Sequence, residues 1–260
     1  MSPSLLASWP RPHFQPGGGD AQVLYAVFGR FEALEPLSAT KYRSAGPPDG
    51  VEISSYGAPE QRDVLDDFRS GWAWDRFVEE SPELAGAVAD TSRCLVVRGV
   101  VTDPSTLDYF RDLIGLIAYL NDGGGLAVYD AQILRWWSPD EWRNDVFARD
   151  DLRPSQHVGI FLSDDDHRGR WYHTRGMRKF GRPDLSVTHV PDGVDDRVLD
   201  LITRFINLQA QGGHVPEGQE IRIAGLPPGL RCHHAGDADD VEFNNAHIEI
   251  VARALMSAGR

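Results

Sequence analysis

The chain has 260 residues, 41% of them hydrophobic, and 39 acidic against 26 basic side chains give it a formal net charge of −13. This length and apolar content predict a folded globular protein with a substantial core and argue against global disorder. The acidic balance disfavours binding to a nucleic-acid backbone or an anionic membrane surface, because both need clustered cations, and it suits a cationic partner.

The beginning of the chain predicts an irregular arm followed by regular structure. Residues 1–20 are rich in proline and glycine, which is typical of an arm without helices or strands. The apolar run 23–28 predicts a strand. Residues 60–80 carry apolar side chains at roughly helical spacing, so we expect one or two helices there.

Cysteine content and terminal sequence bear on the compartment. Cys94 and Cys232 are the two cysteines, too few for a disulfide framework. The first residues lack a basic stretch followed by an apolar one, which argues against a signal peptide. No apolar run reaches the roughly 18 residues of a membrane span. We therefore expect a cytoplasmic protein with reduced thiols.

The clearest unit covers residues 94–130. A β-branched strand over 94–101 is followed by Asp103-Pro104, a pair typical of a helix start. Gly123 to Gly125 predict the end of that helix, and 126–129 predict a second strand. The glycines follow the helix, whereas a phosphate loop precedes one, so we interpret them as a helix stop. The unit is a β-α-β crossover, whose strands we expect to lie parallel in one sheet.

The second half predicts helices and antiparallel strands. Ser138 and Glu141 fit a capping box that begins a short helix over 139–149. Residues 157–190 predict antiparallel strands, and 195–211 predict an amphipathic helix. Residues 220–223 and 246–251 alternate polar and apolar side chains, so we expect two more strands, each with one face exposed to solvent.

These elements together predict an α+β fold. We expect one mixed β-sheet with helices packed on it, including the β-α-β crossover of residues 94–130. Residues 21–260 would form a single domain, with a subdivision near residue 150 left open.

Four segments resemble bacterial proteins of unknown function, the DUF4261-like group. They are residues 112–117, the glycine-rich stretch 123–130, residues 173–185 and residues 239–249. The third segment carries a His-Thr, Gly-Met, Phe-Gly and Pro-x-Leu pattern that recurs in that group. The resemblance covers roughly residues 90–250 and implies an α+β fold. It carries no established activity, so it assigns no catalytic residue.

A metal site is one interpretation of the last strand. His247 and Glu249 are two residues apart, so both side chains point to one face of a strand. Asp239 and Asp240 lie just upstream, and nitrogen and oxygen donors at this density suit a divalent metal. The alternative, which we favour, is a polar, solvent-facing strand after an aspartate-rich turn, because no fixed-spacing metal motif is present.

A cluster of cations predicts an anion- or partner-binding site. Arginine forks grip carboxylates and phosphates, and His173 and Thr174 add further donors. The alternative, which we favour, is ion pairing with Asp164 to Asp166, Asp184 and other surface acids, which would contribute little stability. Six cations fall within 15 residues: Arg168, Arg170, Arg175, Arg178, Lys179 and Arg182.

Two further patterns bear on function. Cys232 precedes two histidines, but neighbouring residues usually face apart, so an activated thiol is the weaker interpretation. Trp136 and Trp137 lie on a predicted strand with rings on opposite faces, and we expect one ring to be exposed for binding. Nucleotide loops and hydrolase elbows do not occur in the sequence.

Two functions fit these observations. The first is a non-enzymatic, cytosolic binding protein without a cofactor, in its strongest form an immunity or antitoxin-like protein that masks a basic partner such as a cationic toxin. The alternative is a metal-assisted hydrolase or other small-molecule enzyme. It would use His247 and Glu249 with Asp239 or Asp240, while the cations at 168–182 hold an anionic substrate.

Overall fold

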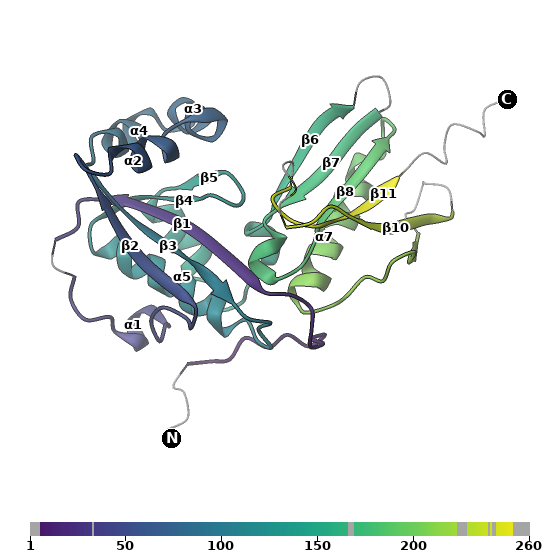
Figure 1. Ribbon diagram of the computed structural model, residues 1–260, viewed down its shortest axis with the longest axis horizontal. Helices are drawn as coiled ribbons and strands as arrows, with labels where there is room; N and C mark the ends of the chain where they lie inside the picture. Colours follow the sequence, from purple (N-terminus) through teal and green to yellow (C-terminus); the bar gives the residue numbers. More distant parts are fainter. Residues whose placement is uncertain are drawn as a thin grey trace. The chain divides into compact units, whose positions relative to one another are not determined.

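The computed structural model describes residues 6–32, 34–165, 169–222, 228–238, 240 and 243–251. The chain forms two compact units: unit 1 comprises residues 1–10 and 22–152, and unit 2 comprises residues 11–21 and 153–260. Each unit has its own β-sheet, as Figure 1 shows. The predicted α+β class is confirmed. We expected one sheet, however, and the described residues form two, which separate close to the subdivision left open near residue 150.

The sheet of unit 1 has five strands in the order β2-β3-β1-β4-β5. The predicted crossover strands β3 and β4 lie in this sheet, but β1 lies between them and pairs antiparallel with β4. A strand inserted into a β-α-β crossover is the split β-α-β arrangement. The strands are β1 (Ala21–Gly29), β2 (Val51–Gly57), β3 (Arg93–Val101), β4 (Gly125–Asp130) and β5 (Arg135–Trp137).

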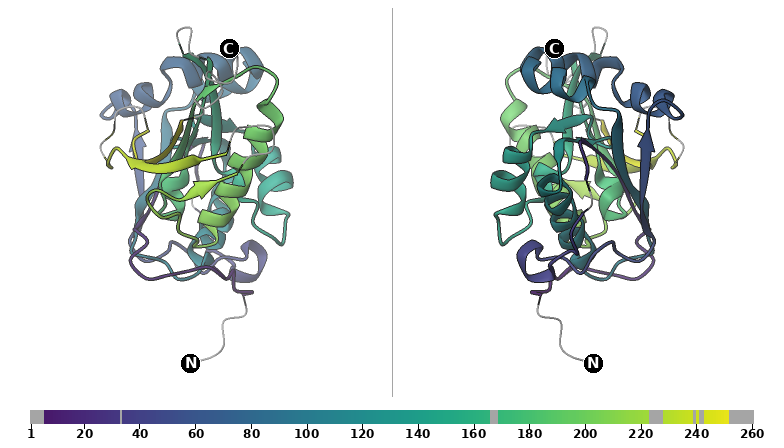
Figure 2. Two further views of the ribbon diagram at one scale, coloured as in Figure 1. Left: turned by 90° about the vertical axis from the view of Figure 1, so that its right-hand side faces the viewer. Right: turned by 90° about the vertical axis from the view of Figure 1, so that its left-hand side faces the viewer.

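Helices cover both faces of this sheet. Figures 1 and 2 show α5 (Asp108–Asp122) on one side and α2 (Arg62–Phe68), α3 (Gly71–Glu80) and α4 (Pro82–Ala89) on the other. Side chains alternate along each strand, so every strand supplies apolar groups to two cores. The core under α2–α4 includes Leu65, Phe77, Val88, Phe28, Cys94, Val96 and Trp136.

Short helices complete unit 1. Helix α1 (Ala39–Tyr42) precedes β2, and α6 (Pro139–Glu141) begins where the capping box predicted, with both capping hydrogen bonds of Ser138 and Glu141 present. A π-helical turn, η1 (Trp142–Phe147), continues α6. Across the described ranges, no helix has the length and apolar content needed to cross a membrane.

The sheet of unit 2 has six strands in the order β6-β7-β8-β11-β10-β9. The antiparallel strands predicted within 157–190 are present as β6, β7 and β8, and the parallel pair β8–β11 makes the sheet mixed. The strands are β6 (Gly159–Asp165), β7 (Gly169–Arg175), β8 (Asp184–Val190), β9 (Glu220–Ile221), β10 (Leu230–Ala235) and β11 (His247–Val251).

One face of this sheet packs against α7 (Asp195–Ala210). The apolar side chains of Tyr172, Val187 and Ile250 are buried on that face, and the Tyr172 hydroxyl donates to Asp195 at the start of α7. The other face, here called the histidine face, carries Phe161, Trp171, His173, Arg175, Ser186, His247 and Glu249. The turns η2 (Pro154–Gln156) and η3 (Met177–Phe180) flank β6 and β8.

The predicted N-terminal arm has no helix or regular strand over residues 6–20. It is nevertheless packed, because the Arg11 guanidinium is buried and donates to the carbonyls of Phe180 (2.8 Å) and Ala210 (3.0 Å). Arg11 thus fixes the arm to unit 2, to which residues 11–21 belong.

Candidate functional site

The predicted cation cluster does not gather in one place. Arg170 pairs with Asp192 at 3.0 Å and Asp195 at 2.7 Å, at the beginning of α7. Arg178 donates to the main-chain and side-chain oxygens of Asn244, at 2.7 and 3.0 Å. Each of these guanidinium groups ties a different segment to the sheet.

The rest of the cluster is buried or turned inward. Arg182 is buried and donates to the carbonyls of Gly212 (2.9 Å) and Gly213 (3.2 Å), just after α7. The Lys179 side chain is fully buried. Arg168 lies outside the described residues. The expected anion-binding cluster is therefore wrong for Lys179 and Arg182, which are buried, whereas Arg170 and Arg178 contact oxygen atoms of the chain itself.

Thr174 belongs to a buried hydrogen-bond network centred on Asp184. Asp184 Oδ1 accepts from the Thr174 hydroxyl (2.8 Å) and the Met177 main-chain N–H (3.2 Å), and its Oδ2 accepts from the Asn245 amide (2.8 Å). Thr174 in turn accepts from the Leu185 N–H at 2.8 Å. Burial raises the pKa of Asp184 to about 6, although these donors oppose the rise. The network is structural, and Thr174 cannot meet a ligand from there.

The histidine face carries four of the predicted site residues, His173, Arg175, His247 and Glu249. His173 stands in register with Phe161 on β6 and Ser186 on β8, and Glu249 on β11 is the next partner of Ser186. His173 and Glu249 therefore share a face but are separated by the strand β8. The alternation of Trp171, His173 and Arg175 along β7 is the sequence signal that finds this face.

Aromatic rings fill the space around His173. The imidazole stacks on Trp171 (centroids 4.3 Å apart) and on Phe161 (5.5 Å), and Phe243 meets it edge-on at 5.7 Å. Phe243 also stacks on His247 at 4.0 Å. The Phe243 ring thus lies between the two histidines. No sequence pattern predicts that placement, since Phe243 comes from an irregular segment.

The protonation of His173 is set by this packing. Burial, and next the positive charge of Arg175, lower the pKa of His173 to about 4. The Nδ1 atom of His173 is buried without a hydrogen-bond partner, so it is closed to a ligand. At neutral pH the group is an uncharged aromatic ring, and it packs as one.

The contribution of His173 to the stability of unit 2 is therefore expected to fall on acidification. Between pH 6.5 and 4 the unfolded chain takes up a proton at His173 that the folded chain does not, so this contribution is lost as the pH falls. Imidazole NMR should give a midpoint near 4, and His173→Phe should remove this part of the pH dependence in urea unfolding. A midpoint near 6.5 would contradict the packing described.

The predicted metal ligands do not assemble. Among the described residues, no group of three or more His, Cys, Asp or Glu side chains could hold a metal ion. Asp240 and His247 approach each other across Gly236, where an added Cβ would lie 2.8 Å from Asp240 Oδ2 and 2.9 Å from His247 Nδ1. Glu249 lies elsewhere on the strand, in register with His233. Asp239 is outside the described residues. The hydrolase alternative thus gains no support.

The two thiols are poor nucleophiles. Cys94 and Cys232 are both buried, and burial raises the pKa of each to about 11. A thiol with such a pKa is protonated at neutral pH, and the thiolate is the reactive form. His233, which follows Cys232, instead contacts Glu217 at 3.0 Å.

The tryptophan pair is buried on both sides. Trp136 stacks on Phe77 (4.8 Å) and Tyr129 (4.7 Å) under α2–α4, while Trp137 meets Trp142 edge-on at 5.9 Å on the opposite face. The rings point to opposite faces as predicted. The expected exposed ring is wrong, because helices cover both faces of the sheet and both side chains are buried.

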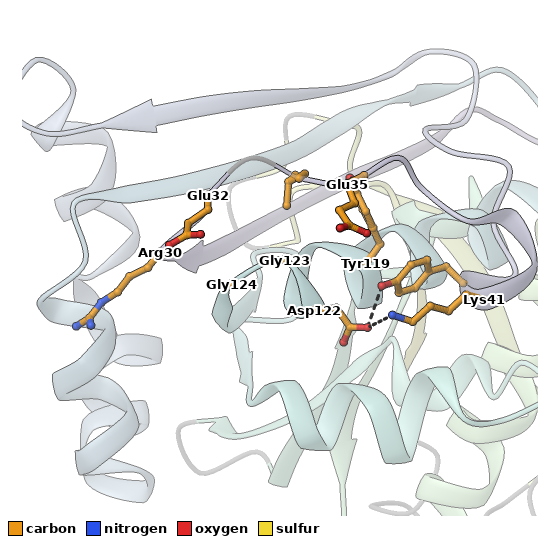
Figure 3. Close-up of a pocket in the computed structure, with 10 residues that line it drawn as sticks. Arg30, Glu32, Glu35, Lys41, Tyr119, Asp122, Gly123 and Gly124 are labelled. Atoms are coloured by element: carbon orange, nitrogen blue, oxygen red, sulfur yellow. Dashed lines mark hydrogen bonds and ion pairs between the residues drawn. The ribbon is translucent and has the colours of Figure 1, made fainter.

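A hollow of about 420 Å³ lies in unit 1 beside the end of α5. Figure 3 shows Lys41 pointing toward Asp122, whose carboxylate pairs with Lys41 (3.1 Å) and Arg143 and accepts from the Tyr42 hydroxyl (2.9 Å). Burial raises the pKa of Asp122, but these partners outweigh it and leave the pKa below its usual value. The hollow is lined by Arg30, Glu32, Leu34, Glu35, Lys41, Tyr42, Tyr119, Asp122, Gly123 and Gly124.

The helix end makes this hollow unsuited to a phosphate. Helix α5 ends at Asp122, and Gly124 takes a φ of 114°, so the glycines are the helix stop that the sequence predicted. The C-terminal end of a helix carries partial negative charge. Glu32 and Glu35 add carboxylates to the lining, which also carries the cations of Arg30 and Lys41.

The outer surface of α2–α4, residues 62–89, is here called the acidic helical layer. Trp72 lies on it with 55% of its surface exposed. The Arg69 guanidinium turns inward to the carbonyls of Val88 (2.7 Å) and Thr91 (2.8 Å), so it does not neutralise the surface. Seven exposed carboxylates lie on the layer: Asp63, Asp66, Asp67, Asp75, Glu79, Glu80 and Glu83.

The acidic charge of the whole chain is concentrated in unit 1. Unit 1 has 23 acidic against 12 basic residues, whereas unit 2 has 16 against 14. The net charge of the full sequence does not reveal this difference between the two units. A count over 62–89 alone, with seven acids and three arginines, would have found the acidic helical layer.

Comparisons with protein-family models, with curated proteins and with solved structures find no match to this chain. The resemblance to the DUF4261-like group therefore stays a prediction, and function has to be inferred from the chemistry of the residues themselves.

Proposed function

We propose that this chain is a non-enzymatic binding protein that captures a basic protein partner on the acidic helical layer. The observation that carries the proposal is the exposed indole of Trp72 among seven exposed carboxylates. Tryptophan is enriched at interface hot spots, and its ring attracts arginine and lysine cations. An immunity or antitoxin-like protein that masks a cationic toxin is the strongest form of this proposal.

The layer is built as a rigid platform. The inner side of α3 packs Trp74 and Phe77 against Trp136, at 5.4 and 4.8 Å between ring centroids. A surface held in this way loses little freedom on binding, which favours affinity. Its carboxylates also raise the rate of encounter with a cationic partner.

Arg76 of this chain already makes the kind of contact with Trp72 that we expect from an arginine of the partner. The Arg76 guanidinium lies over the Trp72 ring at 5.5 Å and pairs with Glu80 at 2.7 Å. Both groups are exposed, so this arrangement is weak and easily exchanged. We expect an arginine of the partner to take the same place between indole and carboxylate.

Charge neutralisation tests the proposal with a synthetic peptide rich in arginine and lysine as the probe. At physiological salt, Asp75→Asn with Glu79→Gln should weaken binding about tenfold, and Trp72→Ala should weaken it about tenfold or more. The control pair Asp196→Asn with Asp200→Asn removes the same charge from the exposed surface of α7 in unit 2. Equal weakening by both pairs, or no binding by the wild type, would refute a docking site on the layer.

A further inference from the structure

The two edges of the sheet in unit 2 differ strongly. One edge strand, β9, has two residues, whereas the other, β6, has seven and is the outer strand next to β7 in Figure 1. An edge strand exposes unpaired N–H and C=O groups, and proteins usually protect it with charges, proline or short length. The first five residues of β6, Gly-Ile-Phe-Leu-Ser, contain neither a charge nor a proline.

Exposed apolar side chains mark the same strand. Ile160 is 37% exposed and Leu162 is 54% exposed, and both point to the face that α7 covers further along the sheet. The edge strand of unit 1, β2, is of equal length but carries an exposed glutamate, Glu52, paired with Arg98 at 2.9 Å. The first five residues of β6 therefore form a neutral, largely apolar edge, whereas the edge at β2 is charged.

We propose that β6 pairs antiparallel with β6 of a second copy of this chain. A two-fold axis at Phe161 places that residue opposite itself and Ile160 opposite Leu162 of the second copy. Directly opposite residues of antiparallel strands point to the same face. The exposed apolar side chains of each copy then meet in pairs, and the two sheets become continuous, with the two α7 helices on one face.

The two aspartates at the end of β6 favour a two-fold axis at Phe161 over an axis closer to Ser163. Strand β6 ends in Asp164 and Asp165, which follow the neutral stretch. With the axis at Phe161, these residues fall opposite Val158 and His157 of the second copy, outside the five paired residues. Moving the axis toward Ser163 brings the aspartates opposite paired apolar residues. A one-residue slip of the pairing itself, with Ile160 opposite Phe161, would place side chains of opposite faces across from each other.

Light scattering over about 1 to 100 µM protein tests the association. The wild type should have twice the monomer mass of 28.9 kDa at the upper concentrations. Leu162→Lys places a charge on the edge and should raise the dimer dissociation constant about 100-fold. The control is Val100→Lys, the same type of change at a 42% exposed site on the inner strand β3, and it should leave the mass unchanged.

Cysteine cross-linking tests the register. Phe161→Cys should form a disulfide between copies under mild oxidation, whereas Ser163→Cys, which faces Gly159 of the second copy, should form far less. A monomer at 100 µM, or a dimer that Leu162→Lys leaves intact, would overturn the proposal. Because β6 belongs to unit 2, neither outcome bears on peptide binding by the acidic helical layer of unit 1.

Discussion

Replacing Asp184 by alanine is expected to destabilise unit 2 by about 3 to 5 kcal/mol, since it removes the carboxylate that accepts from three donors, two of them fully buried. The Thr174 hydroxyl, the Met177 N–H and the Asn245 amide all donate to this one carboxylate. They come from β7, from η3 and from the residues before β11. The substitution thus removes hydrogen bonds to three separate segments at once.

Fluorine NMR of 5-fluorotryptophan can follow this loss during urea unfolding. Trp171 is the one tryptophan in unit 2, and the other six lie in unit 1, so separate resonances report each unit. Asp200→Ala, at an exposed site on α7, is the control and should change stability by less than about 1 kcal/mol. A loss at Trp171 no larger for Asp184→Ala than for this control would show that the network contributes little.

The pH dependence of unit 2 has two opposing parts. The pKa of Asp184 is raised, so its contribution is fully present below about pH 4 and is lost as the pH rises through about 6. The pKa of His173 is lowered, so its contribution is lost as the pH falls over the same range. Asp184→Asn removes the first part, and this variant should lose stability on acidification more steeply than the wild type.

Local features of the fold were predictable from the sequence. Ser138 and Glu141 fix the start of α6 through hydrogen bonds within four residues, and Gly123 to Gly125 end α5 through their own backbone freedom. The apolar periodicity of 195–211 predicted α7 to within a residue at its C-terminal end. Each of these signals acts within one or two helical turns.

Features that depend on distant partners were not predictable. Periodicity indicates a strand but not its neighbour, so β1 between β3 and β4, and the separation into two sheets, had no signal. The spacing of Arg170, Arg178 and Arg182 suggested one cluster. Arg170 pairs with Asp195 at the beginning of α7, Arg182 donates to Gly212 after its end, and Arg178 donates to Asn244. Because these partners lie in different places, the three guanidinium groups do not gather.

Replacing Trp136 by alanine is expected to destabilise unit 1 by about 3 to 5 kcal/mol. Its ring lies between Phe77 and Tyr129 and also contacts Trp74 and Phe28, at 5.4 Å each between centroids. The cavity would open at the contact between the sheet and α3. Trp136→Phe should cost much less, since the Trp136 indole nitrogen has no hydrogen-bond partner to lose.

Trp72 provides the matched control in the same helical layer. Its exposed indole lies on the outer side of α3, so Trp72→Ala should change the stability of unit 1 by about 0.5 kcal/mol or less while it weakens binding of the cationic peptide. Urea unfolding and peptide titration of both variants separate the two roles. If Trp72→Ala destabilised unit 1 as much as Trp136→Ala, the outer indole would be part of the core, and the acidic helical layer would lose the anchor on which partner capture depends.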